Sequence, residues 1–135
     1  MPHQAANDVE SEEKKAWAAF CEANPQDAKL FVRLLAIRGG HVVEATVLWE
    51  LMDHHRAIGL QIPRTLSGQT LQREYGSQFV PTVRSAQRSV EALDSDGLVE
   101  VLRTVKNTPQ KLRLMWSVLA DQLKSVDPRG PGLKR

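Results

Sequence analysis

The fold is decided by residues 81–101, whose sequence is PTVRSAQRSVEALDSDGLVEV. In the first part of this stretch, apolar residues follow one another at intervals of three, four and three positions, which is the spacing of one helix face. These residues are Val83, Ala86, Val90 and Leu93. After Gly97 the apolar residues alternate with others, as they do in a half-buried strand. The stretch therefore predicts a helix over 81–94, with Pro81 in its first turn, followed by a strand.

Toward the carboxyl end, a second alternating run extends from Leu112 to Val118. The polar segment 106–110 separates it from the first run. Two alternating runs around a short polar segment are typical of a β-hairpin, which we expect over residues 99–118. Ser117 is expected to cap a last helix over 118–126.

Toward the amino end, helical periodicity predicts four further helices. They are expected over 9–23, from about Asp27 to the glycine pair Gly39-Gly40, over 42–58 and over 67–75. The last two are followed by glycine, as many helix ends are. Residues 1–8 are expected to be disordered, and the proline-containing segment 60–66 is expected to form a connector.

The predicted order of helix, short helix, tight turn, helix and hairpin resembles the winged helix-turn-helix found in many bacterial transcriptional regulators. The closest local likeness lies in residues 89–101, where Leu93 would pack inward and Gly97 would take the turn into the wing. The expected fold class is thus mainly α with a small antiparallel β-hairpin, in a single domain. Its expected parts are an N-terminal helical extension (1–41), the winged-helix core (42–118) and a C-terminal helix and tail (119–135).

The composition is typical of a single globular domain, with 135 residues of which 41% are hydrophobic and 25% charged. The single cysteine, Cys21, excludes an intramolecular disulfide and fits a reducing compartment. No apolar run approaches the roughly 20 residues of a membrane span, and the first residues lack the features of a signal peptide. We therefore expect a cytoplasmic protein without a membrane partner.

Positive charge is shifted toward the second half of the chain. The net charge is only +2, but residues 60–115 carry eight Lys and Arg against five Asp and Glu, whereas residues 1–25 carry two against five. A basic region favours a nucleic-acid partner. The modest total charge instead favours a protein partner, and this alternative stays open.

The resemblance implies that the helix over 81–94 enters the major groove of double-stranded DNA. At 100° per residue, the side chains that point away from the apolar stripe are Thr82, Arg84, Ser85, Gln87, Arg88 and Ser89. Arginine can hydrogen-bond both acceptors of guanine, and glutamine can do the same for adenine. No acidic residue occurs from Pro81 to Val90, so the amino-terminal turns are the part expected to approach the phosphates.

Further phosphate or minor-groove contacts are expected from the wing and from the short helix. The candidate residues of the wing are Arg103, Lys106, Asn107, Lys111 and Arg113. Around the short helix the candidates, with weaker support, are Arg64, Gln69, Thr70 and Arg73. For each of these residues, the alternative is an ordinary solvated surface.

The residues give no indication of an enzyme, a metal site, a cofactor or a small-molecule effector. His54 and His55 are about 100° apart on one helix, whereas zinc-binding helices place two histidines four residues apart. No cysteine or carboxylate cluster completes a ligand set. No nucleophile, base and orienting group occur in a recognisable pattern.

Our hypothesis is a sequence-specific double-stranded DNA-binding protein, most simply a transcriptional regulator. A homodimer is expected, because one major-groove helix rarely gives enough specificity alone. The alternatives are a winged-helix module that binds another protein, or a plasmid or phage replication or partition factor. RNA is a weaker option, because neither exposed stacking aromatics nor an RNA-binding motif is evident.

Overall fold

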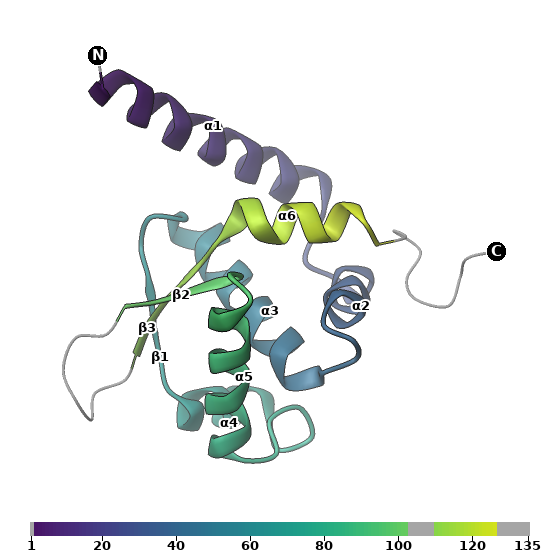
Figure 1. Ribbon diagram of the computed structural model, residues 1–135. Coiled ribbons are helices and arrows are strands. Elements are labelled where there is room, and N and C mark those ends of the chain that lie inside the picture. The colour runs from purple at the N-terminus through teal and green to yellow at the C-terminus, as the bar shows by residue number, and fades with distance from the viewer. Residues whose placement is uncertain (1, 103–109, 127–135) are drawn as a thin grey trace.

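The computed structural model describes residues 2–102 and 110–126, with side chains from residue 12 onward (Figure 1). The elements in chain order are α1 (Pro2–Ala23), α2 (Ala28–Ile37), α3 (Val42–Ile58), β1 (Arg64–Leu66), α4 (Gly68–Tyr75), α5 (Val83–Ser95), β2 (Val99–Leu102), β3 (Gln110–Leu114) and α6 (Trp116–Lys124). The described chain is mainly helical and has one small antiparallel sheet with strand order β1-β3-β2. This confirms the expected fold class at that level.

Helix α3 lies at the centre of the molecule, with α2, α5 and strand β3 packed against it (Figure 1). Val47, Leu48, Leu51 and Met52 of this helix are completely buried, in agreement with the helical periodicity that predicts it over residues 42–58. Trp17 of α1, and Leu30 and Leu34 of α2, belong to the same buried core. The N-terminal helices therefore help to complete the core around α3.

Side-chain caps set the beginnings of three helices. Asp27 accepts a hydrogen bond from the Leu30 N–H at 3.1 Å, and Ser67 accepts one from the Thr70 N–H at 3.1 Å, as expected for these helix starts. The helix predicted from Pro81 begins later, because Thr82 caps it by accepting from the Ser85 N–H at 2.9 Å. Pro81 therefore precedes the cap, and its predicted place in the first turn is wrong.

The sheet departs from prediction in two places. Residues 64–66, expected to lie in a connector, form strand β1 and pair with β3, Arg64 opposite Leu112. Strand β3 ends at Leu114, because the Met115 N–H bonds to the Leu98 carbonyl at 2.9 Å and α6 begins immediately afterwards. Trp116 thus starts the last helix, two residues before the predicted start, and the hairpin is shorter than expected.

Helix α1 begins at Pro2, so the disorder expected over residues 1–8 is wrong for residues 2–8. The sequence from His3 to Ala23 contains no proline or glycine, and proline is tolerated in a first turn, so nothing in it stops a helix. The helix packs on α6, where the ring centroid of Trp116 lies 4.8 Å from that of Trp17 and 4.6 Å from that of Phe20.

Two arginines hold the carboxyl ends of these outer helices. Arg56 of α3 donates to the carbonyls of Cys21 and Asn24, and Arg33 of α2 donates to the carbonyl of Leu123 at 3.3 Å. Cations are favourable at these positions, because the last carbonyls of a helix are unpaired and carry partial negative charge. The contacts fix α1 and α6 to the central layer.

Candidate nucleic-acid interface

Helix α5 has the two-sided character that its sequence predicts. Ala86, Val90 and Leu93 are buried against the core. Thr82, Arg84, Gln87 and Arg88 are exposed, and Ser85 is half-buried. Ser89, expected on the outer face, is instead only 8% exposed, because it lies beside Leu93 and the buried arc of the helix is wider than the apolar stripe.

Arg84 and Arg88 lie one turn apart on the exposed face of α5. Neither forms an ion pair or a side-chain hydrogen bond with any residue that the structure describes. Three other arginines, namely Arg38, Arg64 and Arg113, each bind a carboxylate of the chain. The donors of Arg84 and Arg88 are therefore available to a partner.

Thr82 and Ser85 have a structural role that the sequence prediction did not assign to them. Together they form a capping box, in which the Ser85 hydroxyl also accepts from the Thr82 N–H at 3.2 Å and donates to the Thr82 carbonyl at 2.7 Å. Their hydroxyl groups fix the first turn of α5, the turn that carries Arg84.

The carboxyl end of α5 is acidic and anchored. Glu91 and Asp94 are exposed on the helix. Asp96, which follows it, accepts a hydrogen bond from Arg38 at 2.6 Å, and Arg38 also binds Glu44 at 2.8 Å. The charge on the outer face of α5 therefore changes from positive in its first two turns to negative in its last two.

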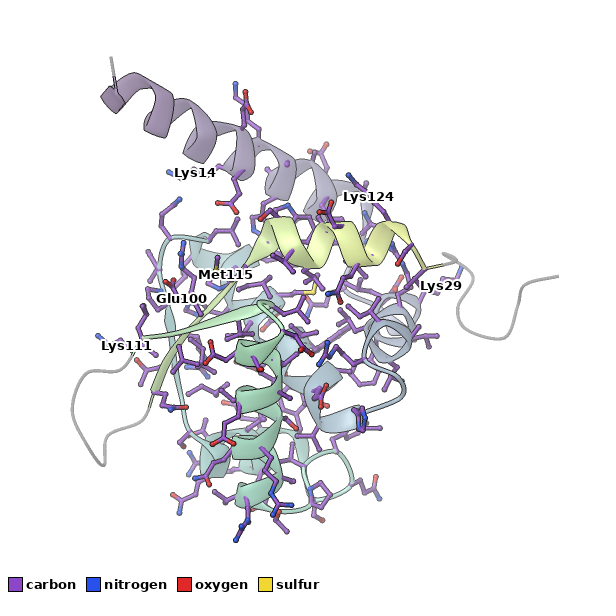
Figure 2. The ribbon with its side chains drawn as sticks, viewed as in Figure 1. Lys14, Lys29, Glu100, Lys111, Met115 and Lys124 are labelled. Carbon is purple, nitrogen blue, oxygen red and sulfur yellow. The ribbon has the colours of Figure 1, made fainter. Side chains whose placement is uncertain are left out.

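The hairpin does not place its described basic residues beside Arg84 and Arg88. Leu112 and Leu114 are buried toward the core, so the alternate residues Lys111 and Arg113 lie on the opposite face of the sheet. Arg113 is held by Glu100 at 2.7 Å, and Lys111 is exposed on the hairpin side of the molecule (Figure 2). The other candidate wing residues, Arg103, Lys106 and Asn107, lie outside the described residues.

Around α4, the residues predicted to contact DNA are in different situations: some are exposed, and others are bound by groups of the same chain. Arg73 is exposed and lies 3.5 Å from the Thr70 hydroxyl. Arg64 forms an ion pair with the buried Glu50 at 3.1 Å. Its guanidinium is therefore already bound, which does not favour the predicted contact with phosphate. Glu50 also accepts from the Tyr75 hydroxyl at 2.7 Å, and burial, followed by that hydrogen bond, raises the pKa of Tyr75. The cluster fastens β1 and α4 to α3.

Two residues that position α5 were missed at the sequence level. Gln72 donates to the carbonyls of Val80 at 3.1 Å and Pro81 at 2.9 Å, and so holds the segment that leads into α5. Gly68 lets α4 approach α5 closely, because a Cβ there would lie 3.0 Å from the Val83 carbonyl oxygen. A glycine at the first position of a short helix is a sequence signal for such an approach.

The histidines of α3 are engaged in hydrogen bonds. The ring of His55 is buried, its Nδ1 lies 2.9 Å from the Gly59 carbonyl, and its Nε2 accepts from the Leu114 N–H at 3.1 Å. Burial lowers the pKa of His55, so the imidazole is neutral at pH 7. His54 binds the Ile62 carbonyl at 2.8 Å. Among residues 12–102 and 110–126, no three metal-ligating side chains gather.

None of the helices that the structure describes is both long enough and apolar enough to span a membrane.

Comparison of the chain with protein-family models, with curated proteins and with solved structures gives no match. The function is therefore inferred from the geometry of α5 and its surroundings.

Proposed function

We propose that this protein binds double-stranded DNA sequence-specifically, with the first two turns of α5 in the major groove. The observation on which the proposal depends is the pair Arg84 and Arg88, exposed one turn apart and without a carboxylate partner in the described chain. Two arginines in this arrangement can each bind a guanine edge with two hydrogen bonds, and Gln87 between them can bind an adenine edge.

The arrangement of elements supports a winged helix-turn-helix. Helix α4, the turn over 76–82, helix α5 and the hairpin β2–β3 follow one another in the order of that motif, and β1 adds a third strand to the hairpin. The tight packing at Gly68 and the hydrogen bonds from Gln72 hold α4 and α5 in a fixed relation. A rigid pair of helices is what a base-reading helix needs.

The charge gradient along α5 favours insertion by its amino-terminal end. That end carries the two arginines and the positive end of the helix dipole, whereas Glu91 and Asp94 lie toward the other end. Phosphates would be attracted to the first two turns and repelled by the last two. Arg73 remains a proposed flanking contact, as do Arg103 and Lys106, which lie outside the described residues.

A regulator of transcription that acts as a cytoplasmic homodimer is the simplest form of this proposal. A single inserted helix contacts few base pairs, and a second copy on a symmetric site would double the contacts. In-vitro selection of bound DNA tests this directly, because recovered palindromes with half-sites about one helical turn apart would indicate a symmetric dimer.

The decisive test of the DNA proposal is a mobility-shift titration of the selected site with wild-type protein and Arg84→Ala/Arg88→Ala. Because each arginine should contribute about 1–3 kcal/mol, we expect the double variant to lose at least about 2 kcal/mol and so to bind at least about thirtyfold more weakly. The matched control is Lys29→Ala/Lys124→Ala, which removes the same charge from exposed sites on α2 and α6 (Figure 2). Equal losses in both variants, or no shift of any DNA at low salt, would refute base reading by α5.

A second function is favoured by a specific observation. Arg113 of the hairpin is neutralised by Glu100, and the end of α5 nearer the sheet is acidic, so the positive charge of this face is small. A module that binds another protein through α5 and the hairpin would not need a more positive surface. A folded protein that binds no DNA at low ionic strength would favour the module.

A further inference from the structure

A groove runs between α5, the start of α4 and the sheet, on the hairpin side of α5. Its volume is about 540 Å³, within the usual range of sites for small molecules. Helix α4, helix α5 and the sheet all contribute to its walls. The groove therefore exists only in the folded domain.

The floor of the groove is apolar. Its apolar lining comes from all three walls: Leu71, Ala86, Val90 and Leu112 are almost completely buried, whereas Val83 and Val101 are half-buried and therefore open to a ligand. Contacts of this kind bind the apolar body of a ligand without selecting its charge. The floor therefore predicts a ligand with a hydrocarbon or aromatic portion.

The rim of the groove is polar and negatively charged. Glu91 and Asp94 of α5 line it, one turn apart, and three glutamines reach it from three different elements: Gln69, Gln87 and Gln110. Neither carboxylate forms an ion pair within the described chain, and no described lining residue is a lysine, an arginine or a histidine. Two carboxylates without a described basic neighbour make this rim attractive to cations and repulsive to phosphate.

We propose that this groove is a binding site for a small amphipathic cation, a molecule with an apolar body and a protonated amine. The body would lie on the floor, and the ammonium group would bind Glu91 and Asp94, with the glutamine amides as neutral partners. The charge of the rim argues against a nucleic-acid strand as the occupant, because phosphates would face the two carboxylates.

The site has a consequence that depends on the proposed function. Gln87 lines the groove and also belongs to the exposed face of α5 that carries Arg84 and Arg88. An occupied groove would change the surroundings of a proposed base-reading side chain. A cationic ligand would therefore alter the affinity for DNA, as an effector does.

The experiment uses three probes with the same apolar body and different charge: 4-phenylbutylamine, 4-phenylbutan-1-ol and 4-phenylbutyrate. Each is titrated into the full chain without DNA, and binding is followed by NMR. We expect the amine to shift the signals of Ala86, Val101 and Leu112, the alcohol to bind more weakly and the carboxylate most weakly. Equal binding of the three probes, or shifts confined to other parts of the molecule, would refute the proposal.

A pair of charge variants tests the role of the rim. Glu91→Gln/Asp94→Asn should weaken binding of the amine about tenfold, as the loss of two exposed ion pairs permits, and leave binding of the alcohol unchanged. The matched control, Glu22→Gln/Asp121→Asn, changes two exposed carboxylates of α1 and α6 and should have no effect. An equal loss in the control would show that only net charge matters and would overturn the site.

A mobility-shift assay with and without the amine then tests regulation separately. If the protein binds no DNA, the proposed function fails while the NMR titration still decides the site. If the amine binds the groove and leaves the DNA affinity unchanged, the site stands and its regulatory role is refuted.

Discussion

Arg38, at the carboxyl end of α2, and Arg88, in the middle of α5, are in opposite situations. The side chain of Arg38 is 11% exposed, donates to Glu44 at 2.8 Å and to Asp96 at 2.6 Å, and so ties the end of α5 to the central helices. Arg88 is exposed and has no carboxylate partner in the described chain. One arginine is committed to the fold, whereas the charge of the other is left for a partner.

The difference suggests a rule for this molecule. Arg33, Arg56, Arg64 and Arg113 resemble Arg38, since each is bound by groups of its own chain. Arg84 and Arg88 are grouped on the outer face of α5. If uncommitted arginines mark the functional surface, substitutions in the two groups should differ in kind: the first should affect stability, and the second binding.

The largest expected effect on stability is that of Arg38→Met. It removes both charged hydrogen bonds and leaves the carboxylate of Glu44, whose side chain is only 12% exposed, without its partner. We expect the free energy of unfolding to fall by about 2–3 kcal/mol, measured by urea denaturation. If the unfolding free energy falls no further than in Arg88→Met, Arg38 contributes no more to folding than Arg88 does.

Acid should reveal a second committed side chain, His55. Its pKa is lowered in the folded protein, mainly by burial, so between that value and the unfolded value of about 6.5 the unfolded chain binds the extra proton. Stability is therefore complete above about pH 6.5 and decreases as the pH falls below it, with a slope approaching about 1.4 kcal/mol per pH unit.

His55→Gln is the variant that isolates this effect. The glutamine amide can donate to the Gly59 carbonyl and accept from the Leu114 N–H, as the imidazole does, but it does not titrate. We expect a flatter dependence of the unfolding free energy on pH in this variant than in the wild-type protein. The same slope in wild type and His55→Gln would assign the acid sensitivity to other groups.

Gly68→Ala should have a smaller effect, directed at the packing of α4 on α5. The added methyl would lie 3.0 Å from the Val83 carbonyl oxygen, and crowding of this kind costs about 1–3 kcal/mol. The higher helix propensity of alanine offsets about 1 kcal/mol of that. We therefore expect a net loss of about 1 kcal/mol, together with weaker DNA binding, since α5 must shift. Unchanged stability and binding would show that α4 adjusts without moving α5.

The sequence predicted those features whose causes are local. The period of α3 and the inner stripe of α5 depend on residues a few positions apart, and both were confirmed. Strand β1 was missed, because three residues are too few to show a period and their partner strand lies more than forty positions away. The bond between Arg38 and Asp96 spans 58 positions and has no local signature.

The candidate site divides in the same way. The exposure of Arg84 and Arg88 follows from the helix period alone, and the structure agrees. The capping box of Thr82 and Ser85 had a local signal, two hydroxyl residues three positions apart, which was interpreted as contact with DNA. The neutralisation of Arg113 depends on the strand register that places it opposite Glu100, and this register is known only from the folded structure.

The smallest expected change in stability is that of Arg88→Ala, and it is the most informative. An exposed side chain with no described partner should contribute less than about 0.5 kcal/mol to folding, and alanine is at least as good a helix former as arginine. The DNA affinity of the same variant should fall, and a sequence re-selected with it should lose the preference at one position of the site. Urea denaturation measures the contribution of Arg88 to folding, and re-selection measures its contribution to DNA recognition. A clear loss of stability with unchanged sequence preference would place Arg88 among the committed arginines and remove the distinction on which the function rests.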